Sequence, residues 1–441
     1  MQAWHCATTA PCSEEVPMFG NTLQKLFRAL RSRNYKLFFG GQAVSLTGYW
    51  MQRVAMSWLV YRITGSPMAL GIVDFVGQIP TLFLGFFAGT LLDRWDLRRV
   101  VIVCQTISMG HAFLLAALTL SGVVEYWHVV ALSAVLGVVN AFELPARLSF
   151  VVHLVDDPED LSNAIALNST LFNGARLVGP SLAGVVIAML GEGLCFLANG
   201  LSYLATLVAL LSVHLARPAR AEKRPGRVLE ETREGWNYAM NFLPIRTILF
   251  SVASISFFGL PYLILLPVFA GDILQGGPQT LGFLTAASGI GALFGSCRMA
   301  LRTTPVGLSL VIARTMALFG TAVAAFAFSR MVPLSMLLMA PIGFSMVVTF
   351  IACNTLLQTL VEDDKRSRVM SLYNMAVSGI APLGSFCAGW SASLVGAPTT
   401  QAVGGLASVI TAVLLWRSLP SLRRWAHPIL VAKGFLPPEA S

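Results

Sequence analysis

Two oppositely charged residues, Arg53 and Asp74, stand inside long apolar stretches. An ionised side chain at the middle of a membrane span costs about 2.5–3.5 kcal/mol on insertion scales, so charges there are rare and usually paired. Arg53 lies eight residues before Tyr61, near the end of one stretch, and Asp74 lies six residues into the next. In antiparallel helices both would lie about 10 Å below the same surface. The spacing predicts an ion pair, either purely structural or a site of reversible protonation at Asp74.

The elements that must hold this pair are twelve apolar stretches. The 441-residue chain is 56% hydrophobic and 12% charged, with a mean hydropathy of +0.71. A membrane-spanning helix needs about 20 apolar residues, whereas a membrane β-barrel would show strands of about ten alternating residues, which these stretches do not. We predict an all-α membrane protein with twelve transmembrane helices at about 37–61, 68–92, 100–124, 127–146, 162–190, 194–215, 246–270, 279–300, 306–329, 333–360, 368–395 and 399–418. In this assignment Asp74 is the one acid well inside a span.

The positions of the basic residues predict the orientation. Of the 30 Lys and Arg residues, only Arg53, Arg176 and Arg314 lie well inside spans and only Arg62 and Arg330 fall in outside loops. The other 25 lie in cytoplasmic segments or at the cytoplasmic ends of spans if the N-terminus is inside. Basic residues concentrate in cytoplasmic loops, so both termini are expected in the cytoplasm of a bacterial inner (plasma) membrane. The net charge of +9 reflects this asymmetry, and nucleic-acid binding is not expected.

Other chemistry is poorly supported by the sequence. The seven Cys and six His are scattered without metal-ligand or disulfide spacing, and no Gly-x-x-x-x-Gly-Lys-Ser/Thr motif for ATP occurs. Residues 1–20 lack an apolar signal-peptide core, and we expect them to be disordered. We therefore expect no metal, no cofactor and no enzymatic activity.

An internal repeat predicts two related halves. Residues 162–191 align without gaps on residues 367–396, which pairs Gly174 with Gly379, Gly179 with Gly384, Gly184 with Gly389 and Gly191 with Gly396. Earlier, the segment 66–71 matches 277–282. Equal topology in both copies requires an even number of helices in each, so six plus six fits. The predicted organisation is an N-terminal tail (1–36), a six-helix bundle (37–215), a cytoplasmic linker (216–245), a second bundle (246–419) and a cytoplasmic C-terminal tail (420–441).

The loop after the second predicted span reads Gly89-Thr-Leu-Leu-Asp93-Arg94-Trp-Asp-Leu-Arg98-Arg99. Its Gly-x-Leu-x-Asp-Arg order resembles the loop between the second and third helices of the major facilitator superfamily. The segments 50–71, 143–147, 163–168 and 176–180 resemble the efflux branch that contains enterobactin exporters and macrolide efflux permeases. Two features depart from the superfamily pattern: Asp96 and Leu97 replace the usual Gly and base, and the corresponding loop of the second half, 298–305, contains no acid.

The resemblance implies roles for several residues. The loop residues Gly89, Asp93, Arg94, Arg98 and Arg99 would form a conformational latch between the halves; the alternative is that they serve only membrane insertion and topology. Gly174, Gly179, Pro180 and Gly184 would form a bend in the fifth helix, or simply allow close packing. Arg176 would face the central cavity and bind an acidic or phenolate group of the substrate, unless it contacts backbone carbonyls or extends to the membrane surface.

The implied function is secondary active export of a small amphiphilic molecule, siderophore- or drug-like, through the membrane. Arg53 and Asp74 would couple export to protons, and a monomer in the lipid bilayer is expected. The excess of buried arginines over Asp74 favours an anionic substrate. An importer or lysophospholipid flippase of the same fold, and a non-transporting sensor, remain alternatives.

Overall fold

The computed structural model describes residues 28–92, 95–213, 236–302, 304–362 and 364–436. Within these ranges every long regular element is a helix. Asp93 and Arg94, the expected disordered segment 1–20 and most of the predicted linker lie outside the described residues.

The first half contains six long helices, each beginning or ending close to a change from apolar to polar sequence. A short 3-10 turn, η1, precedes them, and another, η2, precedes the fifth. Their bounds are η1 (Arg28–Arg31), α2 (Arg33–Thr64), α3 (Pro67–Leu92), α4 (Leu97–Leu120), α5 (Tyr126–Val151), η2 (Pro158–Asp160), α6 (Leu161–Leu190) and α7 (Glu192–Ser212).

The second half also crosses six times, but two of its crossings are interrupted by π-helical turns. The first crossing joins α9, η3, α10 and η4, and the fifth joins α14, η5 and α15. The bounds are α9 (Leu243–Ser254), η3 (Ile255–Gly259), α10 (Tyr262–Val268), η4 (Phe269–Ile273), α11 (Pro278–Ala300), α12 (Leu308–Phe328), α13 (Val332–Leu360), α14 (Arg366–Asn374), η5 (Met375–Gly379), α15 (Ala381–Val395) and α16 (Ala397–Ala432).

The twelve-helix prediction is confirmed. Ten helical stretches among the described residues are long and apolar enough to cross a membrane. The remaining two crossings are α2, which contains several polar residues, and the stretch 366–395, which η5 divides. Several helices are longer than predicted: α2 runs from Arg33 to Thr64, α5 continues to Val151 and α16 to Ala432.

Glycines that the repeat aligns occupy equivalent places. Gly191 ends α6 with φ of 80°, and Gly396 ends α15 with φ of 86°; each directly precedes the last helix of its half. A positive φ of this size strains residues that have a Cβ atom, so glycine suits both corners. Gly179 packs against α2, and Gly384 packs against the start of the second half at Phe257.

The two halves meet along α3 with α15 and along α6 with α11. We call the side of the molecule at which α2 begins the basic face, and the opposite side the closed face. Near the closed face, a methyl group on Gly71 would lie 3.2 Å from Gly389 Cα, and one on Gly184 would lie 2.9 Å from Gly282 Cα. Both contacts therefore need residues without side chains, as at close crossings of membrane helices.

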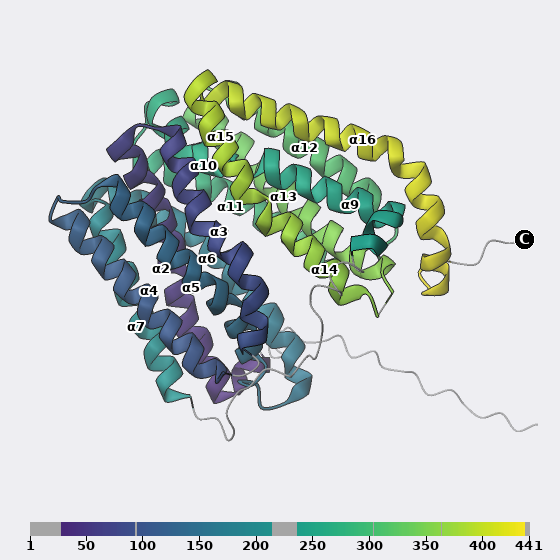
Figure 1. Cartoon of the computed structure of the whole chain (residues 1–441), viewed down its shortest axis with the longest axis horizontal. Helices are drawn as coiled ribbons and strands as arrows, with labels where there is room; N and C mark the ends of the chain where they lie inside the picture. The colour runs from purple at the N-terminus through teal and green to yellow at the C-terminus, as the bar shows by residue number, and fades with distance from the viewer. Residues whose placement is uncertain (1–27, 93–94, 214–235, 303, 363, 437–441) are drawn as a thin grey trace, which may run out of the picture.

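Figure 1 shows the first half (purple to blue) and the second half (teal to yellow) meeting where α3 lies beside α15. The ribbons diverge toward α14 and the far end of α7. Neither glycine contact lies on that diverging side. The close glycine contacts between the halves therefore lie near the closed face, and the ribbons of the two halves spread apart toward the other.

Candidate substrate site

Trp50 of α2 lies at the centre of the candidate site. The guanidinium carbons of Arg53 and Arg176 lie 5.6 Å and 5.7 Å from the centre of its ring, and the Phe172 ring packs edge-on at 5.6 Å. Two cations beside one indole form cation–π contacts that offset part of their desolvation cost. Within the described part of the chain, Trp50 Nε1 is buried without a hydrogen-bond partner. The indole N–H is therefore an unsatisfied donor inside the site.

Arg53 and Asp74 are brought together across α2 and α3. The Arg53 Nη2 and Asp74 Oδ1 atoms are 3.6 Å apart, and Gln78 Nε2 donates a 2.6 Å hydrogen bond to Asp74 Oδ2. The Arg53 side chain is 44% exposed, whereas that of Asp74 is 15% exposed. Since Arg53 shares Trp50 with Arg176 of α6, the space that exposes it lies inside the bundle. A ligand in this space would reach the exposed guanidinium group of Arg53, whose contact with Asp74 is long at 3.6 Å.

The second half contributes a tyrosine to the same region. Arg176 lies within electrostatic range of Tyr262 of α10 and of Arg53. The Tyr262 hydroxyl is 3.0 Å from Ser288 Oγ of α11. Arg176 therefore lies on the side of the first half that faces α10, where Tyr262 is buried.

A second buried ion pair was missed by the sequence analysis. Arg147 Nε and Glu143 Oε1 of α5 are 3.2 Å apart, with side chains 7% and 14% exposed. Gln42 of α2 accepts a 3.3 Å hydrogen bond from Arg147, and Gln105 of α4 donates a 3.2 Å bond to Glu143. The prediction that Asp74 is the one acid well inside a span is therefore wrong, because α5 extends past both residues. The i, i+4 spacing of opposite charges was the available signal.

The described part of the predicted latch contacts only the first half in the interactions that the structure shows. Arg98 donates hydrogen bonds to the carbonyl oxygens of Leu210 and Leu211 at 3.0 and 3.1 Å. It therefore satisfies carbonyls at the end of α7. Asp96, which departs from the superfamily pattern, caps α4 by accepting a 3.1 Å hydrogen bond from the Arg99 backbone N–H. Gly89 lies in the last turns of α3, and Asp93 and Arg94 lie outside the described residues.

In the second half, a short loop leads from α13 to the start of α14, which contains Arg368. Lys365 Nζ donates a 2.6 Å hydrogen bond to Glu362 and lies 4.6 Å from the centre of the Tyr238 ring. The hydrogen bond to Glu362 raises the pKa of Lys365, and nearby acids raise it further. These contacts hold the end of the linker beside the start of α14.

The fifth-helix residues have different surroundings. A methyl group on Gly179 would lie 2.6 Å from Trp50 Cβ, and Gly184 abuts α11, whereas nothing lies within 4 Å of the corresponding point on Gly174. Pro180 stands inside the continuous helix α6. Gly179 therefore lets α6 pack closely against α2 at Trp50. Gly184 lets α6 of the first half pack closely against α11 of the second half.

A further cross-half contact lies at the closed face. The Tyr61 hydroxyl donates a 2.5 Å hydrogen bond to Asp272 Oδ1, which joins the end of α2 to η4. A methyl group on Gly271 would overlap the Tyr61 ring. Within the described ranges, no group of three or more His, Cys, Asp or Glu residues could hold a metal ion. The site thus consists of charged and aromatic side chains between two halves that touch at one face.

Comparison with known proteins agrees with this architecture. Residues 25–433 match the family described as transmembrane secretion effector, a branch of the major facilitator superfamily. The chain belongs to this family. It is 24% identical to the staphyloferrin A transporter of Staphylococcus aureus, over 86% of this chain and 95% of that protein. It is 26% identical to the multidrug efflux pump Tap of Mycolicibacterium fortuitum, over 79% and 86% of the two chains.

The fold is also shared with solved structures. A point mutant of the peptide transporter POT in complex with sulfate superposes with a TM-score of 0.71 at 12% identity, covering 91% of this chain and 99% of that one. At this identity the likeness shows the fold alone. The family match over residues 25–433, together with this fold, makes the chain a multi-pass major facilitator transporter and not an enzyme.

Proposed function

We propose that this transporter exports a small amphiphilic molecule, siderophore- or drug-like, in exchange for protons. The observation that carries the proposal is the Trp50 site, where two arginines and one aspartate meet between the halves. Relatives named as a siderophore transporter and as a multidrug efflux pump support the substrate class. The basic face would be cytoplasmic, and the diverging halves would then admit substrate from inside the cell.

Antiport constrains how substrate and proton share the site. If both an anionic substrate and ionised Asp74 bound only to Arg53, protonation of Asp74 would strengthen substrate binding, which is the sign of symport. Antiport requires that the substrate bind better when Asp74 is ionised. We therefore propose that an acidic group of the substrate contacts Arg176, while a hydroxyl or amine donates to Asp74. Protonation of Asp74 would weaken the second contact and promote release outside.

The latch fits the same cycle. In the outward-facing state, Asp93 and Arg94 would approach the start of α14 near Arg368 and hold the basic face shut. In the observed arrangement the halves diverge on that side. The closed-face contacts Gly71–Gly389, Gly184–Gly282 and Tyr61–Asp272 would separate as the latch forms.

Transport assays test the proposal. A deletion strain is compared with its parent for drug susceptibility and secreted compounds, and the compound whose export is lost becomes the probe in proteoliposomes. Asp74→Asn should abolish accumulation driven by a pH gradient but retain exchange of labelled for unlabelled substrate. Arg176→Gln should raise the half-saturating concentration in both assays. The matched control is Asp156→Asn, an exposed acid on the basic face.

The outcomes separate coupling from binding and direction. Gradient-driven transport by Asp74→Asn at the wild-type level would refute the coupling role. A deletion strain that accumulates less substrate than its parent would instead indicate an importer. Movement of lysophospholipid in place of soluble compounds would indicate the flippase alternative.

A further inference from the structure

The last helix, α16, extends beyond the membrane-spanning part of the second half. Its 36 residues are about 54 Å long at 1.5 Å per residue, against about 30 Å for the hydrocarbon core of a bilayer. Pro420 and Pro428 lie within its C-terminal half, and Figure 1 shows the yellow end of α16 bending away from the line of its first part, beside α9. Lys433 Nζ donates a 2.8 Å hydrogen bond to the carbonyl of Thr359 near the end of α13. This end of α16 is therefore fixed against the basic face.

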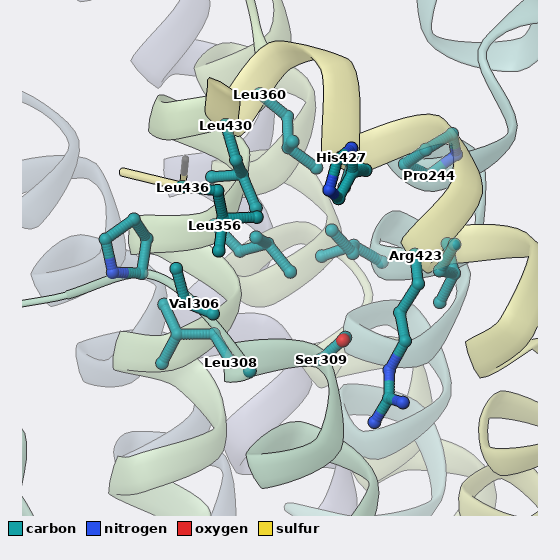
Figure 2. A pocket seen from close by; sticks show the side chains of 15 residues that line it. Pro244, Val306, Leu308, Ser309, Leu356, Leu360, Arg423, His427, Leu430 and Leu436 are labelled. Atoms are coloured by element: carbon teal, nitrogen blue, oxygen red, sulfur yellow. The ribbon is translucent and has the colours of Figure 1, made fainter. Parts of the chain in front are cut away.

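A cavity of about 280 Å³ lies beneath the turned end of α16 (Figure 2). The first turns of α9 and α12 and the last turn of α13 form its other walls. Most of the lining is aliphatic, from Ile248, Leu308, Leu356, Leu360, Leu422 and Leu430. This volume is near the lower end of small-molecule pockets, which begin at roughly 300 Å³. The cavity suits an aliphatic chain rather than a large polar ligand.

One side of the cavity is cationic. Arg423 extends from α16 alongside Ser309 of α12, and His427 lies one turn further along α16 (Figure 2). Arg423 is exposed and makes no hydrogen bond or ion pair with the residues that the structure describes. The sequence has no Asp or Glu between Lys365 and Pro438, whereas α16 contains Arg417, Arg423 and Arg424. An anionic group at the rim would therefore be repelled by no acidic residue of this helix.

The same end of α16 has the features of a membrane-surface segment. Trp425 is 54% exposed and packs edge-on against Phe242, with ring centres 5.8 Å apart. Exposed Trp residues gather at the level of lipid headgroups, and Arg or Lys clusters beside a spanning helix attract anionic lipids. The aliphatic cavity thus lies at headgroup depth, below an arginine whose charge is available.

We propose that the cavity beneath α16 binds one acyl chain of an anionic phospholipid from the leaflet at the basic face, with the lipid phosphate held by Arg423. A zwitterionic lipid carries the same phosphate, but its ammonium group would be repelled by the arginines at this end of α16, so a lipid of net negative charge is favoured. The aliphatic walls favour a lipid over free phosphate. Since all of its walls belong to the second half, this site is separate from the Trp50 site. The lipid would fasten the end of α16 to α12 and α13.

Native mass spectrometry of the full-length protein in detergent tests the site. Increasing amounts of phosphatidylglycerol or phosphatidylcholine are added, and the bound fraction is measured. The wild type should bind the first adduct of phosphatidylglycerol in preference to phosphatidylcholine. Arg423→Gln should reduce that binding about fivefold, the effect expected for one basic residue at a membrane surface. The matched control Arg424→Gln, one residue along α16 and outside the cavity lining, should reduce it less.

A second pair of variants tests the cavity itself. Ser309→Phe places a ring beside Arg423 and should prevent binding of the first lipid, whereas Ser421→Phe, on the exposed side of α16, should not. Equal binding of the two lipids by the wild type would overturn the proposal, as would unchanged binding by Ser309→Phe. An equal loss in Arg423→Gln and Arg424→Gln would indicate a diffuse surface charge, and it would overturn the assignment to this cavity.

Discussion

The contact between Gly184 and Gly282 offers a direct test of how the closed face is held. A methyl group at Gly184 would lie 2.9 Å from Gly282 Cα, 3.1 Å from the Pro278 carbonyl oxygen and 3.3 Å from Gln279 Cα. All three atoms belong to the backbone of α11, so a side-chain rotation cannot relieve the overlap. Gly184→Ala must therefore push α6 and α11 apart in the observed state.

The magnitude follows from the cost of overpacking. Extra methyl groups in tightly packed interiors cost about 1–3 kcal/mol. If the halves separate at the closed face in the other state, the cost falls on one state alone. The equilibrium between the two states should then shift by about 5- to 150-fold toward the outward-open one. The higher helix propensity of Ala acts on α6 in both states and cancels.

Distance measurements between the halves provide the assay. Spin labels at Val123 and Met331, which are exposed in turns at the closed face, report the separation after replacement of the native cysteines. Gly184→Ala should increase the population with the longer distance. The matched control in the same helix is Gly174→Ala, because nothing lies within 4 Å of the added methyl group.

Two results would refute this reasoning. An unchanged distance distribution in Gly184→Ala would show that the close contact does not limit opening. A larger shift in Gly174→Ala than in Gly184→Ala would favour the fifth-helix bend, predicted from the sequence, over close packing at the interface.

Two further substitutions test the first half. Glu143→Gln leaves the buried Arg147 without its anion and should lower the unfolding free energy by about 3–5 kcal/mol, as measured by thermal or denaturant unfolding in detergent. Glu159→Gln, which breaks an exposed pair with Arg28, should have a much smaller effect, and equal effects would contradict the assignment. Asp96→Ala removes the cap of α4 and should cost about 1 kcal/mol in the same assay, whereas Asp96→Ser should restore most of it.

Hydropathy located the helices because each apolar run ends where charged or turn-forming residues begin. The predicted fifth span, 162–190, differs from α6 by one residue. The prediction failed where charges continue inside a helix. It ended the fourth span at 146, although α5 continues to Val151 and buries both Glu143 and Arg147. Hydropathy scores each residue alone, so it cannot register that two charges neutralise each other and find Gln42 and Gln105 on neighbouring helices.

The pairing of Arg53 with Asp74 could be predicted from their spacing, because adjacent antiparallel helices fix the relative depth of their residues. The contact of Arg53 and Arg176 with Trp50 could not be predicted in this way. Trp50, Arg53 and Arg176 meet only because Gly179 lets α6 approach α2 closely. A one-dimensional pattern contains no information on which faces of distant helices are in contact.

The sequence by itself determined the class of protein, the number of spans and the internal repeat, since these depend on the cost of placing polar groups in lipid and on local periodicity. Only the tertiary structure showed which aligned glycines touch. The repeat pairs Gly71 with Gly282 and Gly184 with Gly389, but the contacts are Gly71 with Gly389 and Gly282 with Gly184. The physical reason is that the halves pack against each other about a common axis. The rotation that relates the halves carries Gly71 onto Gly282 and Gly389 onto Gly184, so one contact is repeated as the other.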